Sequence, residues 1–219
     1  MNKPVTMTIC LLIILLVLAA CNKSDGLTGR TISIYSTSVG DIIDFGGYKW
    51  RVLEVTGSRA LVLSENVLEM RPYNSYQDVT WESCYLRSYL NGSFYNSFTS
   101  AERERIVESR IINADNPWYG TSGGVDTVDM VFLLSLDEVV RYFGDSGQLR
   151  SGGNGYFSDQ YNSARIATYN DEATWWWLRS PGSDSYSAAH VLDGGQVDVD
   201  GSPVHGDHGG VRPALWLNQ

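Results

Sequence analysis

Apolar residues, several of them β-branched or aromatic, dominate two neighbouring stretches, residues 48–55 and 59–65. Short runs of this composition are typical of strands. The intervening Thr56-Gly57-Ser58 predicts a hairpin with a three-residue loop. Further apolar runs predict strands at residues 130–134, 175–179, 188–191, 196–199 and 211–217.

Three other segments carry helical signals. Aromatic residues recur at helical spacing within residues 81–90. Residues 99–102 (Thr-Ser-Ala-Glu) form a capping-box pattern that predicts a charged helix to about Ser109. Residues 135–138 (Ser-Leu-Asp-Glu) repeat the pattern before a helix that Gly144 closes. With helices mostly in the middle and strands at both ends, the pattern predicts an α+β fold.

The first twenty residues predict a secretion signal. Lys3 precedes an apolar run over residues 9–20 that is too short to span a bilayer comfortably. The run ends in Leu18-Ala19-Ala20-Cys21, which resembles the bacterial lipobox. The resemblance implies cleavage before Cys21 and lipidation of its thiol, so that acyl chains at Cys21 anchor the protein to a membrane. An ordinary signal peptide followed by a coincidental cysteine is the alternative.

Residues 1–20 are therefore expected to be a lipoprotein signal peptide and residues 21–30 a flexible polar tether. Residues 31–219 are expected to form a single domain in the cell envelope, lipid-anchored and exposed at the cell surface. Because Cys10 leaves with the signal and Cys21 is acylated, Cys84 stands alone in the mature domain, where we expect it to be a core residue.

Composition narrows the classes of function. The chain has 25 acidic and 16 basic residues, with a formal net charge of -9. Nucleic-acid binding needs clustered Lys and Arg, so no nucleic-acid partner is expected. The 22 Gly, 13 Tyr and 7 Trp are typical of turn-rich β or α+β domains and of recognition surfaces.

The segment from Ser183 to Gly210 is unusual in composition. It contains all three His of the protein and five Asp, but no Lys, Arg, Glu, Met or Trp. Small and apolar residues recur through it as a skeleton, at positions 188, 189, 191, 195, 197, 201, 204 and 209–211, and irregular polar residues fill the spaces between them. The flanking residues 175–182 and 211–217 are rich in large apolar side chains and predict buried strands. Fold-building positions and freely varying positions therefore separate along this segment.

Two sets of residues carry a family resemblance. Residues 176–182 (Trp-Trp-Leu-Arg-Ser-Pro-Gly), the skeleton, and residues 210–217 (Gly-Val-Arg-Pro-Ala-Leu-Trp-Leu) resemble the variable region of target proteins of bacterial diversity-generating retroelements. Upstream, residues 45–53, 80–82 and 116–121 resemble a family of bacterial domains of unknown function that often carries this region. The resemblance covers most of residues 40–217. It implies a C-type-lectin-like fold, related to that of the formylglycine-generating enzymes, whose last strands and loops display diversified residues.

In such systems a reverse transcriptase copies a template with errors at adenines, and the copy replaces the 3′ end of the target gene. An AAC codon randomised at both adenines never encodes Lys, Glu, Gln, Met or Trp, and within residues 183–210 only Gln196 falls outside the accessible set. The variable region is thus placed at about residues 183–210. The candidate ligand-binding residues are Ser183, Asp184, Ser185, Tyr186, Ser187, His190, Leu192, Asp193, Gly194, Asp198, Asp200, Ser202, Pro203, His205, Gly206, Asp207 and His208.

Rival chemistries find less support in the sequence. Formylglycine-generating enzymes use a pair of cysteines, which a lone Cys84 cannot supply, and no Gly-x-Ser-x-Gly nucleophile elbow occurs. No catalytic residue, cofactor or metal site is therefore expected. Two alternatives stay open: clusters of the Asp or His residues between 190 and 208 as calcium or zinc ligands, and residues 175–177 as a sugar-stacking surface rather than core.

The favoured interpretation is a surface-displayed protein that binds an unknown protein or glycan on a cell or phage surface through its diversified C-terminal loops. The alternative is an undiversified cell-envelope lipoprotein with a structural or enzymatic lectin-like domain.

Overall fold

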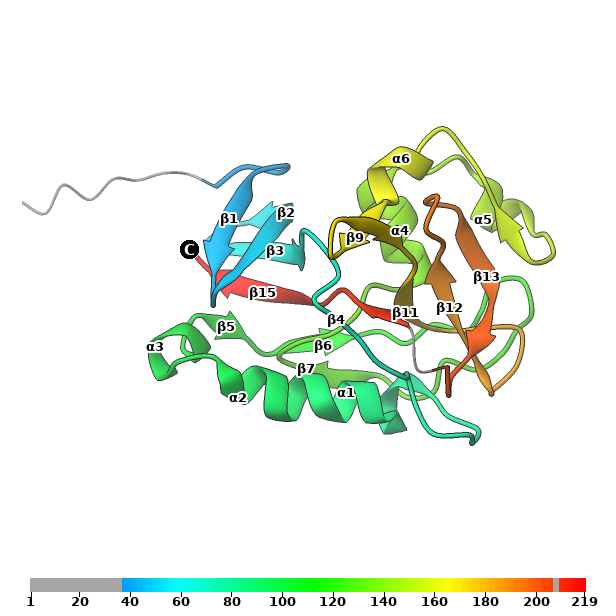
Figure 1. The fold of residues 1–219 in the computed structure, drawn as a ribbon, viewed down its shortest axis with the longest axis horizontal. Helices are drawn as coiled ribbons and strands as arrows, with labels where there is room; N and C mark the ends of the chain where they lie inside the picture. Colours follow the sequence, from blue (N-terminus) through cyan, green and yellow to red (C-terminus); the bar gives the residue numbers. More distant parts are fainter. Residues whose placement is uncertain (1–36, 207–208) are drawn as a thin grey trace, which may run out of the picture. The chain divides into compact units, whose positions relative to one another are not determined.

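Two sheets organise the domain in the computed structural model, which describes residues 37–206 and 209–219 (Figure 1). The expected signal peptide, tether and lipidation site at Cys21 lie outside the described residues, as do the candidates Asp207 and His208. The described residues form one compact unit. Sheets and a few short helices make it an α+β domain, as predicted.

The first sheet is antiparallel and brings the two ends of the domain together. Its strands lie in the order β1-β2-β3-β15-β5, with bounds β1 (Ile42–Phe45), β2 (Tyr48–Thr56), β3 (Arg59–Ser64), β15 (Ala214–Asn218) and β5 (Ile106–Val107). The predicted hairpin of β2 and β3 is confirmed. Its loop has two residues instead of three, because Thr56 pairs directly with Arg59, and Gly57 takes the positive φ of +59° that so tight a turn requires.

The second sheet carries the candidate region. Its strand order is β4-β14-β11-β12-β13-β8, with bounds β4 (Glu69–Met70), β14 (Gly210–Val211), β11 (Trp176–Pro181), β12 (Ser187–Val191), β13 (Val197–Pro203) and β8 (Tyr156–Phe157). Among the described strands of this sheet, only β11 and β14 pair in parallel. Two small ribbons accompany the sheets, β6 (Ser109–Ile111) with β7 (Thr127–Asp129) and β9 (Ala167–Tyr169) with β10 (Glu172–Thr174).

Short helices fill the middle of the chain. Their bounds are η1 (Trp81–Ser83), α1 (Tyr85–Tyr89), the π-helical η2 (Leu90–Phe94), α2 (Tyr95–Ser97), α3 (Ser100–Arg103), α4 (Leu136–Phe143), α5 (Gln148–Ser151) and α6 (Asn162–Arg165). The predicted helix over residues 81–90 is interrupted at Cys84, whose extended backbone caps α1. Both predicted capping boxes are present, and Gly144 closes α4 as expected.

Three predictions about helix and strand boundaries are wrong. The helix predicted to reach Ser109 ends at Arg103, because Ile106 and Val107 pair with β15 instead. Residues 131–134 are buried and Met130 is half-buried, but the segment forms only one bridge, between Phe132 and Ala214. The Asn91 side chain takes the place of a neighbouring strand there: its Oδ1 accepts from the N–H of Met130 at 2.7 Å.

The third error concerns the end of the chain. Residues 211–217 predict one strand, but β14 belongs to the second sheet and β15 to the first. Pro213, which has no backbone N–H, lies between them. The last strand segments therefore link the two sheets, and this connection fixes the end of the candidate region to the core.

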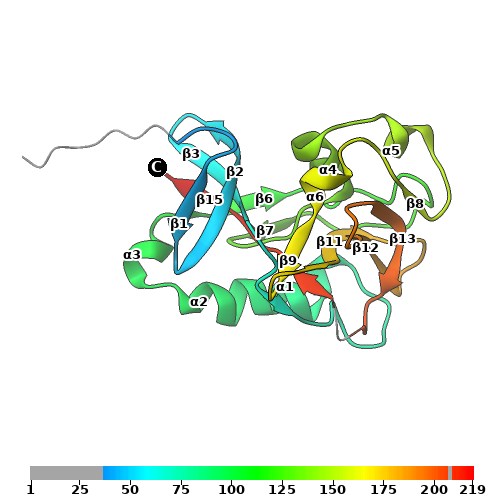
Figure 2. The same cartoon turned by 45° about the horizontal axis from the view of Figure 1, so that its top comes forward.

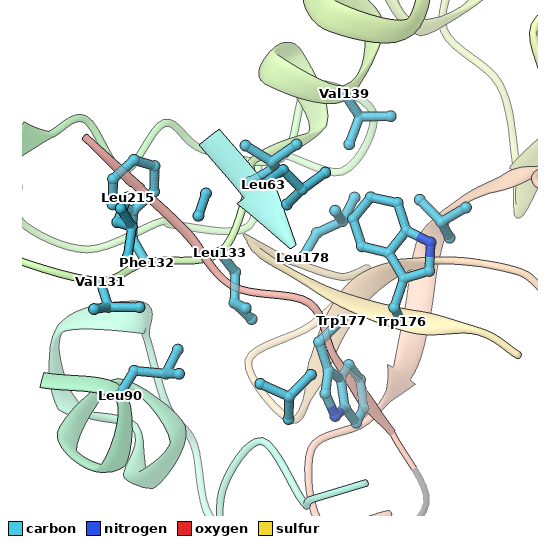
Figure 3. Close-up of a cluster of buried hydrophobic side chains, with 14 of the residues drawn as sticks. Leu63, Leu90, Val131, Phe132, Leu133, Val139, Trp176, Trp177, Leu178 and Leu215 are labelled. Carbon is cyan, nitrogen blue, oxygen red and sulfur yellow. The ribbon is translucent and has the colours of Figure 1, made fainter. Parts of the chain in front are cut away.

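The core surrounds β11. Trp176, Trp177 and Leu178 are fully buried, and Figure 3 shows the rings of the two tryptophans on opposite sides of their strand. Both faces of β11 are thus covered, in agreement with a core role for these two rings. Trp216, also expected in the core, is only half-buried in β15.

Candidate functional site

The candidate residues lie on the hairpin of β12 and β13 and on the two connections at its base. Ser187 pairs with Pro203 at one end of the hairpin and Val191 pairs with Val197 at the other. The connection from β11 to β12 and the chain after β13 meet at the first end, where the Val204 N–H donates to the Tyr186 carbonyl at 2.9 Å. Figures 1 and 2 show β12 beside β11, with β13 on the far side of β12.

Burial separates the skeleton from the candidates. Nearly all skeleton residues are buried, including Ala188, Val197 and Val204, and Gly201 is half-buried. Of the candidates, five are exposed: Asp184, Tyr186, Asp193, Pro203 and His205. Nine are half-buried: Ser183, Ser185, Ser187, Leu192, Gly194, Asp198, Asp200, Ser202 and Gly206. The separation seen along the sequence is therefore also a separation between interior and surface.

The glycines follow the same division. A Cβ on the skeleton residue Gly195 would lie 1.9 Å from the Asn162 carbonyl oxygen, and one on Gly209 would lie 1.8 Å from Trp177 Nε1. At the candidate Gly194 the nearest atom, at 2.7 Å, is the end of the flexible Gln196 side chain. Close backbone approach thus requires glycine at the skeleton positions and not at Gly194.

Most of the described candidates lie in two groups at opposite ends of the hairpin, with His190, Asp198 and Asp200 on the strands between them. Ser183–Ser187 and Ser202–Gly206 lie together at the base, whereas Leu192, Asp193 and Gly194 form the opposite turn. The five residues of β12 separate the groups by about 16 Å at ~3.3 Å per residue.

His190 does not have the exposed position expected of a diversified residue. Its side chain is 4% exposed and packs edge-on against Trp175, with ring centroids 4.9 Å apart. Its Nε2 lies 3.8 Å from Asp198 Oδ2, beyond hydrogen-bond distance. Burial lowers the pKa of His190 below its usual range, against an opposing effect of the Asp198 carboxylate. The rings of Trp175 and Trp177 cover this position, which periodicity along β12 alone does not reveal.

A segment that the sequence analysis did not single out completes the base of the hairpin. Tyr76, in the connection between β4 and η1, packs against Tyr186 and His205 with ring centroids 5.8 and 4.7 Å away. Asp78 accepts a hydrogen bond from the Ser185 hydroxyl. The available signal was an aromatic residue inside the polar stretch Asn74-Ser75-Tyr76-Gln77-Asp78, where no core position is expected.

The buried side-chain amide of Asn116 supports the base of the hairpin. Asn116 is almost fully buried, and its Nδ2 donates to the carbonyls of Pro181, Gly182 and Val199 at 2.8–3.1 Å. Its Oδ1 accepts from the N–H groups of Trp118 and Tyr119. One side chain therefore links the 116–119 turn to both strands that lead into the candidate loops.

Two observations on the described residues concern metal binding and cysteine reactivity. Within residues 37–206 and 209–219, no three His, Cys, Asp or Glu side chains gather closely enough to hold a metal ion. Cys84 is buried as expected, and burial raises the pKa of its thiol to about 12, which disfavours the nucleophilic thiolate. In the part of the chain that the structure describes, no helix is long and apolar enough to cross a bilayer.

These features define the class of protein: an α+β domain with a buried scaffold and a polar, aromatic loop face at the base of one hairpin. The chain belongs to the DUF6273 family, a domain of unknown function, whose family model matches residues 57–219. The comparisons with curated proteins and with solved structures found no match.

Proposed function

We propose that this chain is a surface-displayed ligand-binding protein, not an enzyme, and that a diversity-generating retroelement varies its C-terminal loops. The observation that most supports this proposal is the separation of buried skeleton from exposed and half-buried polar positions between Ser183 and Gly206. Side chains that the core does not need are free to change without loss of the fold.

The chemistry of the loop face suits recognition. Ser, Asp, His and Tyr side chains combine adaptable hydrogen bonding with aromatic contact area, as in antibody loops. Tyr186 is the candidate of largest contact area at the base of the hairpin and is 43% exposed. We expect its truncation to cost about 2 kcal/mol of binding free energy, as at a hot spot.

The proposed architecture is C-type-lectin-like. It is supported by the pairing of the last strand β15 with β3 of the N-terminal hairpin, which holds both ends of the domain in one sheet. The proposed location is the cell envelope, with the domain held at the cell surface through a lipid on Cys21. The proposed partner is a protein or glycan on a cell or phage surface, without a cofactor or nucleic acid.

The first test separates folding from binding. We would replace Asp184, Tyr186 and His205 together by other residues that an AAC codon can yield, and compare the variant with Trp177→Ala. The loop variant is expected to keep its melting temperature within a few degrees, because exposed substitutions usually cost within about 0.5 kcal/mol each. Trp177→Ala is expected to lose about 3 to 5 kcal/mol, because it empties a fully buried site.

The second test addresses recognition. This chain and a sibling with rerandomised loops are displayed and panned against bacterial, phage and host-cell surfaces. The proposal expects different binding profiles for two equally well folded proteins. Identical profiles would contradict it and support the alternative of an undiversified envelope lipoprotein.

A further inference from the structure

Three segments meet at the base of the hairpin, and their composition sets the charge around the loop face. They are residues 72–86, 111–126 and 180–206, and they contain no Lys or Arg. Hydrogen bonds join them: the Val79 N–H donates to the Ser185 carbonyl at 3.0 Å, and Asn116 reaches Gly182. Folding therefore gathers segments of one charge sign around the loop face.

Two carboxylates lie beside the aromatic cluster of Tyr76, Tyr186 and His205. Asp78 binds the Ser185 hydroxyl and Asp184 binds the Tyr186 N–H, each through Oδ1. Among the described residues neither carboxylate forms an ion pair with Lys or Arg. Both negative charges are thus held in place by neutral donors, without a basic side chain to neutralise them.

The aromatic cluster is exposed although it is well packed internally. Tyr76 is 73% exposed, and its ring contacts both Tyr186 and His205, so the three side chains support one another. Aromatic faces next to carboxylates attract cations through the ring quadrupole and through direct charge attraction. Exposed rings that already pack together lose little further entropy when a partner binds.

We propose that Tyr76, Tyr186 and His205 form an aromatic platform for a cationic partner, a peptide or protein surface bearing Arg or Lys, with Asp78 and Asp184 binding the cation. This inference rests on the proposed function and gives that loop face a partner chemistry. It also assigns a role to Tyr76 and Asp78, which lie more than 100 residues before the candidate region. Part of the face is therefore fixed, whatever residues the loops carry.

Charge favours a cationic partner over a neutral glycan. A sugar also stacks on aromatic rings, but it gains nothing from the absence of basic residues in all three segments. A cationic partner gains from the negative potential both in its rate of encounter and in the bound state.

The test uses a labelled heptapeptide of alternating Gly and Arg as the probe, with a citrulline-for-arginine peptide of the same shape as its neutral control. We expect the full chain to bind the arginine peptide at least about tenfold more tightly, and added salt to weaken binding. Tyr76→Ala is expected to weaken binding about five- to tenfold, and Tyr76→Phe to retain it. Asp78→Asn and Asp184→Asn should each weaken binding several-fold.

Two variants serve as matched controls for these changes. Tyr85 in α1 is 62% exposed and belongs to none of the described ring pairs, so Tyr85→Ala should leave binding unchanged. Asp44 in β1 is an exposed carboxylate on the other sheet, so Asp44→Asn should also have no effect. Thermal melts of every variant establish that the fold is retained.

Several outcomes would overturn the inference. Equal affinities for the arginine and citrulline peptides would show that the platform does not recognise a cation. Equal losses of affinity in Tyr85→Ala and Tyr76→Ala would show the same. Binding of neutral chitohexaose in preference to the arginine peptide would favour a glycan partner. In these cases loop-dependent panning profiles would still support the proposed function, whereas identical profiles would reject the proposed function by itself.

Discussion

Adjacent glycines in the turn between β12 and β13 provide a test at the scale of single residues. Gly195 has a φ of +82° and no room for a Cβ beside Asn162, whereas Gly194 faces only a flexible side chain. We expect Gly195→Ala to lower the free energy of unfolding by at least about 2 kcal/mol, because it adds left-handed strain to a backbone clash. Gly194→Ala should stay within about 0.5 kcal/mol. Urea denaturation measures both, and equal losses would contradict the division of skeleton from loop.

His190 predicts a pH dependence of stability. Its pKa in the folded protein is lowered by burial, so the unfolded chain, with a histidine pKa of about 6.5, takes up the proton first as pH falls. Its contribution to stability is therefore fully present above about pH 6.5 and is lost as pH falls through the folded-state pKa. Melting temperatures from pH 8 to 5 should fall less steeply in His190→Asn than in the unaltered chain.

The exposed His205 is the control for this measurement. His205→Asn is expected to keep the steep pH dependence of the unaltered chain. A His190→Asn variant with the same slope as the unaltered chain would show that other groups cause the loss of stability.

At the scale of elements, Asn116 connects the turn at residues 116–119 with the strands that carry the loops. Asn116→Ala removes the shared donor for three buried carbonyls and the acceptor for two N–H groups. We expect a loss of about 3 kcal/mol, since buried polar groups left without partners are costly. Asn154→Ala is the control, because its exposed side chain only accepts from the Tyr119 hydroxyl. A loss below about 1 kcal/mol in Asn116→Ala would mean that the loop base does not depend on this amide.

At the scale of the whole molecule, membrane attachment is predicted to depend on one side chain, the thiol of Cys21. Cys21→Ala should abolish acylation and release the protein from membranes, because acyl chains contribute roughly 0.8 kcal/mol per buried methylene and no other anchor is expected. Fractionation followed by salt and carbonate washes measures the effect. A variant that stays in the membrane fraction would contradict the lipoprotein interpretation.

Local signals in the sequence determined much of the fold. The apolar runs of β2 and β3, the two capping boxes and the glycine that closes α4 all depend on residues close together in the chain, and all are present. The division of residues 183–206 into skeleton and candidates was also readable from the sequence, because small residues recur wherever backbones approach closely. These features need no knowledge of distant partners.

Contacts between distant segments decided the rest. Ile106 forms a strand only because β15 lies beside it. Residues 211–217 form parts of two strands instead of one, because β14 pairs within the second sheet and β15 within the first. His190 is buried because Trp175 covers it, and Tyr76 reaches the loop face because its segment bonds to residues more than 100 positions later. The sequence by itself indicated most of the side chains that are free of the core, His190 excepted, since this depends largely on local pattern. Only the tertiary structure decided which of them share one face, because packing between remote segments sets their distances.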